Sequence, residues 1–483
     1  MEDTFMFNPK PVRPETQGIA SKHITNMIER LEALEIPMHS ILIARNDQLV
    51  YESYYKPYDT KKLHRMFSIS KTYTALAIGH LITVGKLHLD NHIVDYFPEK
   101  CPEQVHPWIQ AMTIRNMLEM RTCHSATTYK HDLKSDWVES FFTTKPDHPA
   151  GTVFHYDTSS PHVLCALVEK LTGKPMYTYL LEDVLPELEL SSEGFMLPDP
   201  FGVSIGGSGL CCTSMDLMKI GHFLLHEGYI NGRQVIDKDY LQLATGDLNP
   251  TIVKSPILSE NQGYGFQIWR HARNGYAAYG MGGQFIIVAP EKNLILVTTA
   301  DTQGYNGGTL QIHTAFFEEI LDKLSDTPLE VNEQDALELQ KLTEKLSLTP
   351  VKGNTTSSYL NRVNGVSYKL LDNKAGLTDI KVTFHETNGI LSIKGTNFCG
   401  DISFGIGNMI EGKLPVCDFY YVASAAWLTE QVLYIKCHIC DTSVGSIHIQ
   451  IHFEGEQLTM YQRIVEETMS KDFVPGHFIG YCN

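Results

Sequence analysis

Ser68 and Lys71 stand three residues apart at the start of an apolar run, and their types suit nucleophilic catalysis. The run 66–79 predicts the beginning of a buried helix, on which residues three apart share one face. A serine hydroxyl becomes a useful nucleophile when an adjacent base takes its proton, and a desolvated lysine amine can be that base. The positive end of the helix would favour the negative charge that develops in such a reaction. The pair therefore predicts acyl transfer through a covalent serine ester.

A second Ser-x-x-Lys match, at Ser53 and Lys56, shows that the four-residue pattern alone is weak. It follows the alternating stretch 48–52, which predicts a strand. Residues three apart on a strand point to opposite faces, so Lys56 could not serve Ser53 as a base. The predicted local structure therefore selects Ser68.

Tyr156, within the stretch 149–158, is the candidate group that passes a proton to the leaving group. A phenol beside a lysine ammonium has its ionised form favoured, so it can shuttle protons near neutral pH. The alternative is an ordinary core tyrosine with an apolar body and a polar tip. The triplet Tyr-Asp-Thr also recurs at 58–60, so the triplet by itself decides nothing.

A glycine-rich stretch at 278–284 offers backbone N–H groups for an oxyanion, with Gly280 and Met281 at its centre. Glycines let the backbone approach a bound substrate closely. A plain hairpin turn is the alternative interpretation of the same residues.

Together and in this order, these segments resemble the serine β-lactamase-related hydrolases, a family that includes class C β-lactamases, low-molecular-weight penicillin-binding proteins, D-aminopeptidases and esterases. Tyr156-Asp157-Thr158 lies where the family has Tyr-x-Asn. Further similar segments are 113–122, the glycine-rich stretch 206–217, and 280–297. The resemblance covers roughly residues 20–325 and implies an α+β, β-lactamase/transpeptidase-like fold, in which helices and a helical insertion flank an antiparallel sheet.

The resemblance also assigns roles to individual residues. It implies Ser68 as the nucleophile, Lys71 as its base and Tyr156 as the acid/base partner. The backbone N–H groups of Ser68 and Met281 would form the oxyanion hole. The other positions expected beside the substrate are Thr158, Tyr279 and Gly280.

Two departures from the family pattern bear on the substrate. Ala278 stands where the third motif usually begins with lysine or histidine, so a cation that holds a substrate carboxylate is missing. Thr158 replaces the usual asparagine. Both changes argue against β-lactams or peptidyl-D-Ala-D-Ala as natural substrates. The predicted function is a serine hydrolase acting on a small ester or on an amide or peptide; the alternative is a catalytically silent binding or scaffold protein.

Composition excludes several other classes. The chain has 483 residues, of which 43% are apolar, and a net charge of -17 without a basic run, which argues against nucleic acid as a partner. No stretch is apolar for long enough to span a membrane, and the first residues do not resemble a signal peptide, so a cytoplasmic protein is predicted. Ten cysteines are then expected to be free thiols.

The pattern of elements predicts four segments along the chain. They are an irregular lead-in at 1–18, a hydrolase domain at 19–325 that includes a strand at 263–270, a linker at 326–354 with a helix near 333–346, and an all-β barrel or lipocalin-like domain at 355–483. The last domain could restrict access to the site or mediate self-association into a homo-oligomer. A small molecule or short peptide is the expected substrate.

No metal site and no cofactor are expected for this protein. Cys437 and Cys440 fall on an alternating stretch that predicts a strand, so their sulfur atoms would point to opposite faces. No second cysteine pair lies at zinc-binding spacing.

Overall fold

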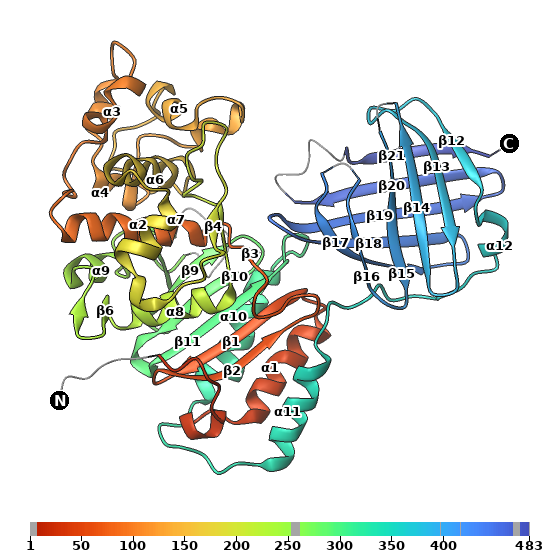
Figure 1. The fold of residues 1–483 in the computed structure, drawn as a ribbon, viewed down its shortest axis with the longest axis horizontal. Coiled ribbons are helices and arrows are strands. Elements are labelled where there is room, and N and C mark those ends of the chain that lie inside the picture. The colour runs from red at the N-terminus through yellow and green to blue at the C-terminus, as the bar shows by residue number, and fades with distance from the viewer. Residues whose placement is uncertain (1–6, 253–260, 397, 416, 467–473, 483) are drawn as a thin grey trace. The chain divides into compact units, whose positions relative to one another are not determined.

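The computed structural model describes residues 7–252, 261–396, 398–415, 417–466 and 474–482, so the first six residues of the expected lead-in lie outside it. The chain forms two compact units, drawn in Figure 1. The first contains residues 1–54, 58–300 and 307–346, and the second contains 55–57, 301–306 and 347–483. Among the described helices, none combines the length and apolar character that crossing a membrane requires.

The first unit is built on one six-stranded sheet of order β2-β1-β11-β10-β9-β8, and every neighbouring pair is antiparallel. Segments from both ends of the unit therefore lie side by side, as predicted. The strands are β1 (Met38–Arg45), β2 (Gln48–Tyr54), β8 (Trp269–His271), β9 (Gly275–Gly280), β10 (Gln284–Ala289) and β11 (Leu294–Ala300).

Helices cover both faces of this sheet because its central strands are apolar on both sides. On β10, Phe285 contacts His313 of helix α10 (Gly308–Glu319), whereas Ile286 lies in the core that the other face shares with helices α2 (Ile69–Thr83) and α8 (Ser214–Leu225). Successive strand residues point to opposite faces, so these two contacts identify the two layers. Helix α1 (Ser21–Ala33) packs beside α10.

The middle of the unit is mostly helical, as predicted, with short strands between the helices (Figure 1). The helices are α3 (Pro107–Gln110), α4 (Ile114–Leu118), α5 (Trp137–Thr143), α6 (Ser159–Thr172), α7 (Met176–Tyr179) and α9 (Lys238–Ala244). The strands are β3 (His64–Arg65), β4 (Phe195–Met196), β5 (Leu210–Cys212), β6 (Tyr229–Ile230) and β7 (Arg233–Gln234). The predicted fold class of the unit, an antiparallel sheet with flanking helices and a helical insertion, is confirmed.

The predicted strand at 263–270 is wrong over most of its length. Only Trp269–His271 forms a strand, and of the described residues before it only Tyr264 makes isolated bridges. Gly263 has a φ of 108° and Gln267 a φ of 60°, which interrupt extended backbone. The buried amide of Gln267 instead donates to the carbonyl oxygens of Met117 and Leu118, at 3.0 and 2.9 Å. Tertiary contacts to α4 therefore override the local apolar pattern.

The segment expected as a linker contains helix α11 (Glu333–Lys345), which packs on α1. Leu339 is the buried residue of α11, and Asn332 caps the helix by accepting from the backbone N–H groups of Gln334 and Asp335. Tyr51 and Thr343 share a hydrogen bond of 2.9 Å. Residues up to 346 accordingly belong to the first unit.

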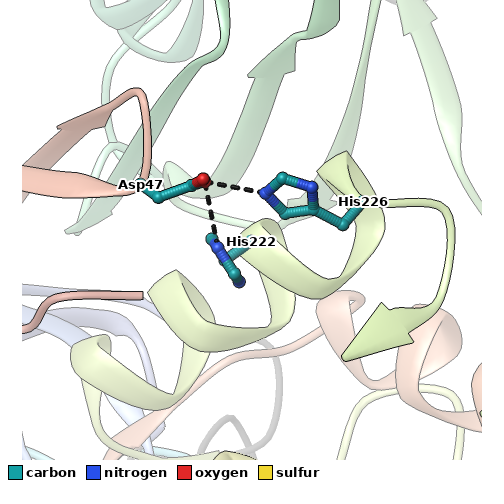
Figure 2. Close-up of side chains that lie close together, drawn as sticks. All are labelled: Asp47, His222 and His226. Atoms are coloured by element: carbon teal, nitrogen blue, oxygen red, sulfur yellow. Dashed lines mark hydrogen bonds and ion pairs between the residues drawn. The ribbon is translucent and has the colours of Figure 1, made fainter. Parts of the chain in front are cut away.

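The turn between β1 and β2 lies against the C-terminal part of α8, as Figure 2 shows. Asp47 Oδ1 is 2.7 Å from His226 Nε2 and 3.0 Å from His222 Nε2. Burial favours a higher pKa for Asp47, but the two imidazoles outweigh burial and hold this pKa well below its usual range. Asp47 is therefore a carboxylate at neutral pH.

The second unit is a β-barrel, which confirms the all-β prediction for the C-terminal part. Its ten-stranded sheet closes because β15 also pairs with β17. The strands are β12 (Ser367–Leu370), β13 (Leu377–Phe384), β14 (Asn388–Gly395), β15 (Cys399–Ile406), β16 (Ile410–Lys413), β17 (Tyr420–Trp427), β18 (Val432–Cys440), β19 (Val444–Glu454), β20 (Gln457–Val465) and β21 (Gly476–Tyr481), with the short helix α12 (Leu360–Val363) before them.

Large side chains fill the interior of the barrel, including Trp427, Tyr368 and Phe453, each at most 1% exposed. Cys437 lies in this core and Cys440 does not belong to the same cluster, consistent with their positions on opposite faces of β18. The ten cysteines are thiols and not disulfides.

Candidate active site

Ser68 stands at the start of α2, directly after a strained turn that packing and hydrogen bonds hold in place. Phe67 has a φ of 45°, a left-handed conformation that is costly for a bulky residue. Its buried ring is covered by the Arg65 guanidinium, 5.0 Å from the ring centroid. Ser70 Oγ donates to the carbonyl oxygen of Phe67 at 2.6 Å and accepts from the backbone N–H of Leu210 at 2.9 Å. This turn places Ser68 at the N-cap of the helix.

Lys71 is 1% exposed, and its amine reaches three oxygen atoms. Lys71 Nζ lies 2.9 Å from Ser68 Oγ, 2.7 Å from the carbonyl oxygen of Gly207, and 3.5 Å from Thr158 Oγ1. An uncharged amine has two N–H groups and one lone pair. Gly207 and Thr158 can take the two N–H groups, which leaves the lone pair for the proton of Ser68. The geometry therefore suits proton transfer between Ser68 and Lys71.

The sequence analysis did not assign a role to the Gly207 carbonyl. The sequence feature that could have indicated it is the glycine-rich stretch 206–209, which packs closely against the start of α6. A Cβ atom at Gly207 would overlap the Thr158 side chain and lie 2.7 Å from the Thr158 carbonyl oxygen. Only glycine allows this close approach, and the approach brings the Gly207 carbonyl to Lys71.

The second Ser-x-x-Lys match forms no comparable arrangement. Ser53 is buried on β2, where its hydroxyl lies 3.4 Å from the carbonyl oxygen of Ile41, and Lys56 is exposed. The two matches therefore differ because one lies on a helix and the other follows a strand, as expected.

Tyr156 comes from the stretch before α6 and lies beside the lysine amine. Lys71 Nζ is 4.9 Å from the centroid of the Tyr156 ring. The ring packs at 5.1 Å from that of Trp269 and at 6.2 Å from that of Tyr264. Tyr279, the other predicted aromatic residue, packs against the same cluster. The sequence analysis did not anticipate Trp269 as a neighbour of Tyr156, because only the folded sheet brings the two rings together.

Asp157, the middle residue of the predicted Tyr-Asp-Thr motif, stabilises the start of α6. It is 1% exposed, and its carboxylate accepts from Ser159 Oγ at 2.7 Å, Ser160 N at 2.8 Å and Ser160 Oγ at 2.9 Å. The contact from Ser160 N satisfies one of the backbone N–H groups that a helix start leaves unpaired. Asp157 thus fixes the beginning of α6 between the two residues that approach Lys71.

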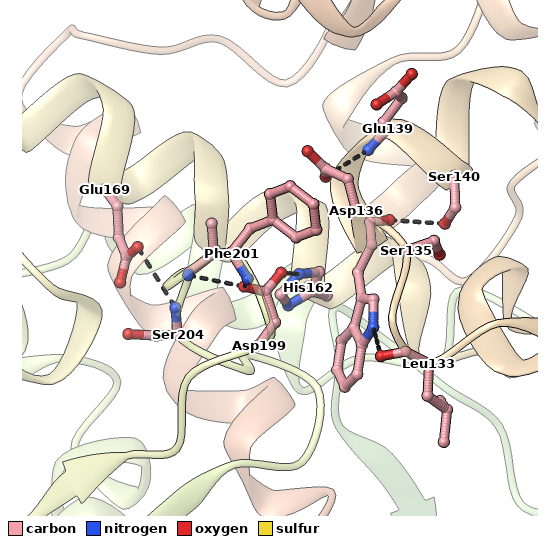
Figure 3. A network of polar contacts seen from close by, with 12 residues as sticks. Leu133, Ser135, Asp136, Glu139, Ser140, His162, Glu169, Asp199, Phe201 and Ser204 are labelled. Carbon is pink, nitrogen blue, oxygen red and sulfur yellow. Dashed lines mark hydrogen bonds and ion pairs between the residues drawn. The ribbon is translucent and has the colours of Figure 1, made fainter.

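A buried polar network one turn further along holds α6 in place (Figure 3). His162 Nε2 lies 3.1 Å from Asp199 Oδ2, and both side chains are fully buried. Asp199 Oδ1 also accepts from the backbone N–H groups of Phe201 and Val203, at 2.8 and 2.9 Å. Burial alone would raise the pKa of Asp199, but these hydrogen bonds outweigh burial and lower it. The network joins α6 to the loop at 199–204, shortly before Gly207.

The predicted oxyanion segment lies next to the chain that carries Ser68. Gly280, the last residue of β9, is so close to the carbonyl oxygen of Met66 that a Cβ atom would overlap it. Met281 follows in the turn, where the buried amide of Gln284 donates to its carbonyl oxygen at 2.7 Å. The turn is therefore held beside the start of α2, which is where an oxyanion hole for Ser68 would have to be.

Ala278 is 2% exposed and lies in the core shared with α2. A packed methyl group therefore stands where the family resemblance leads us to expect a cation. A carboxylate of a substrate would find no positive side chain at this position.

Comparison with known proteins identifies the family of this chain. The beta-lactamase family model matches residues 24–314, more than half of the 483 residues. The 6-aminohexanoate-dimer hydrolase of Paenarthrobacter ureafaciens is 21% identical over 309 residues, which cover 59% of this chain and 78% of the relative. The structure of a penicillin-binding protein homologue from Caulobacter crescentus superposes with a TM-score of 0.51 at 16% identity, covering 63% of this chain and 99% of that one. The matched region contains the whole sheet and the Ser68–Lys71 pair, and the chain belongs to the beta-lactamase family of hydrolases.

Proposed function

We propose that this protein is a serine hydrolase that forms an acyl-enzyme on Ser68. The observation that carries the proposal is the buried Lys71 amine 2.9 Å from the Ser68 hydroxyl, on the same helix. Family membership supports hydrolysis as the reaction class.

In the proposed reaction, Ser68 Oγ attacks the substrate carbonyl carbon while Lys71 takes the hydroxyl proton. The backbone N–H groups of Ser68 and Met281 stabilise the oxyanion. Tyr156, beside Lys71, relays the proton to the departing alcohol or amine. Water then attacks the ester on Ser68, the C–O bond to Ser68 breaks, and the hydroxyl recovers its proton.

The side chains around the candidate site favour substrates with an uncharged acyl group. Ala278 removes one cation that could bind a carboxylate, and Tyr156, Trp269 and Tyr279 provide aromatic surface. The related Paenarthrobacter enzyme is named as a hydrolase of a 6-aminohexanoate dimer. We therefore propose small esters or amides and short peptides as the substrate class.

The test is labelling and turnover with a matched serine control. A fluorophosphonate probe should label the wild type and Ser53→Ala but not Ser68→Ala. Turnover of a panel of p-nitrophenyl esters and of D- and L-amino-acid amides should follow the same pattern. Equal labelling of Ser68→Ala and the wild type would refute the nucleophile. No labelling and no turnover in any folded variant would favour a silent binding protein.

A further inference from the structure

We propose that Asp47, His222 and His226 form a binding site for a divalent transition-metal ion, for which zinc has the best chemical match. This inference does not depend on the proposed acyl-transfer function. In the part of the chain that the structure describes, these three residues are the one group of His, Cys, Asp and Glu side chains whose ligand atoms converge, all within 4.8 Å of one another.

The two histidines are placed by the helix and the carboxylate by a turn. His222 and His226 are four residues apart on and just after α8, so their rings emerge on one face. Asp47 approaches them from the β1–β2 turn, with a φ of 62°. The backbone N–H of Asn8 donates to the Asp47 carbonyl oxygen at 2.9 Å, which holds the turn in this position. Figure 2 shows the Nε2 side of both rings directed at the same carboxylate.

His222 Nε2 is a buried nitrogen whose contact with the protein, among the described residues, falls short of a regular hydrogen bond. The His222 side chain is 2% exposed, and its Nε2 atom lies 3.0 Å from Asp47 Oδ1. That contact is not aligned as a hydrogen bond, and among the described residues the atom has no other hydrogen-bond partner. A buried nitrogen left in this state is costly. A metal ion between the three side chains would satisfy it, because a neutral imidazole offers a lone pair.

The donor set and spacing match zinc. Two imidazoles and one carboxylate are common zinc ligands, with Zn–N and Zn–O distances of about 2.0–2.2 Å. Tetrahedral geometry at those bond lengths separates neighbouring ligand atoms by about 3.4 Å. The present separations of 2.7 and 3.0 Å from Asp47 Oδ1 need to open by less than 1 Å. Magnesium and calcium prefer sets of oxygen ligands, so two imidazole nitrogens disfavour them.

The site is closed on one side and open on the other. Phe7 covers His222, with ring centroids 5.5 Å apart, whereas Asp47 and His226 are partly exposed. The exposed side leaves a path for the ion and room for water as the fourth ligand. The ion would join the β1–β2 turn to the end of α8, and its expected role is to stabilise the first unit.

The test uses full-length protein freed of metal by a chelator. Addition of Co²⁺, a spectroscopic substitute for Zn²⁺, should give one bound ion per chain with the weak visible bands of nitrogen and oxygen ligands. Zn²⁺ should displace it and raise Tm. His226→Gln and Asp47→Asn should each weaken binding at least about 10-fold and abolish the rise in Tm.

His23→Gln is the matched control, because His23 is a partly buried histidine on another helix, and it should behave as the wild type. Circular dichroism establishes that each variant is folded. Binding that is unchanged in both ligand variants would overturn the proposal. So would the intense near-ultraviolet band of cobalt–thiolate bonds, which would place the ion on the cysteines, or the absence of binding to the wild type.

Discussion

Lys71 Nζ lies 2.7 Å from the carbonyl oxygen of Gly207, a residue 136 positions later in the chain. This hydrogen bond fixes the amine that faces Ser68, and it exists because Gly207 can press against Thr158. The geometry of the serine–lysine pair therefore depends on a turn that is remote from both residues in the sequence.

Gly207→Ala should disturb this relationship. The added Cβ atom would overlap Thr158, so the backbone must shift and carry the carbonyl away from Lys71. A misplacement of about 1 Å can cost about 10²-fold in rate, and we expect a fall in kcat of that order. Gly304→Ala is the control, because a Cβ atom there meets Val465 at an ordinary 3.5 Å. Equal kcat values for the two variants would contradict the role of Gly207.

Lys71→Met should remove nearly all turnover while keeping most of the buried volume. Methionine fills the space of the lysine stem but cannot accept the Ser68 proton, so the loss of kcat/KM should be at least about 10²–10⁴-fold. The comparison is made on p-nitrophenyl esters, with Tm as the measure of folding. A folded variant that retains half of the wild-type rate would show that Lys71 is not the base.

Tyr156→Phe should slow the reaction by about 10²–10⁴-fold, the usual effect of a positioned acid or base. The phenylalanine ring keeps the contacts with Trp269 and Tyr264, so Tm should change little. Amines leave less readily than alcohols without protonation, so the effect should be larger on amides than on esters of the same acyl group. Unchanged rates on both would leave Tyr156 as a packing residue only.

Asp157→Ala should destabilise the start of α6. The variant loses hydrogen bonds from Ser159 and from the backbone and side chain of Ser160, and loss of such a cap costs about 0.5–2 kcal/mol. The free energy of unfolding from urea titration measures this cost. Because α6 begins next to Thr158, kcat should fall as well. Asp157→Asn keeps one acceptor oxygen and should recover part of both losses.

The stability of the barrel unit should depend on pH through Asp301. Burial raises the pKa of Asp301 from 3.8 to about 6. Between about pH 4 and pH 6 the folded state then holds a proton that the unfolded chain has released, so the free energy of unfolding falls as pH rises through this window. One pKa unit corresponds to about 1.4 kcal/mol, which sets the effect at about 2–3 kcal/mol.

Asp301→Asn is neutral at every pH and should lack this slope. The measurement is the difference in free energy of unfolding between wild type and variant at several pH values from 4 to 7. A difference that stays constant across that range would contradict the raised pKa.

The sequence by itself determined the elements whose signals are local. The apolar run after Ser68 predicted α2, and the alternating stretch 48–52 predicted β2, which the structure extends to Tyr54. The same local reasoning separated Ser68 from Ser53, because helix and strand place residues three apart on the same face or on opposite faces. His222 and His226, four apart, carried an equally local signal that was not used.

Only the tertiary structure decided which residues distant in the sequence come into contact. The Gly207 carbonyl at Lys71, Trp269 at Tyr156, and Asp47 at His222 and His226 join segments separated by more than a hundred residues. The interruption of extended backbone at Gly263 and Gln267, where an apolar pattern predicted a strand, is likewise set by contacts to α4. Periodicity reports which face of an element is apolar, but it does not report which distant surface will cover that face, because that depends on packing the whole core at once.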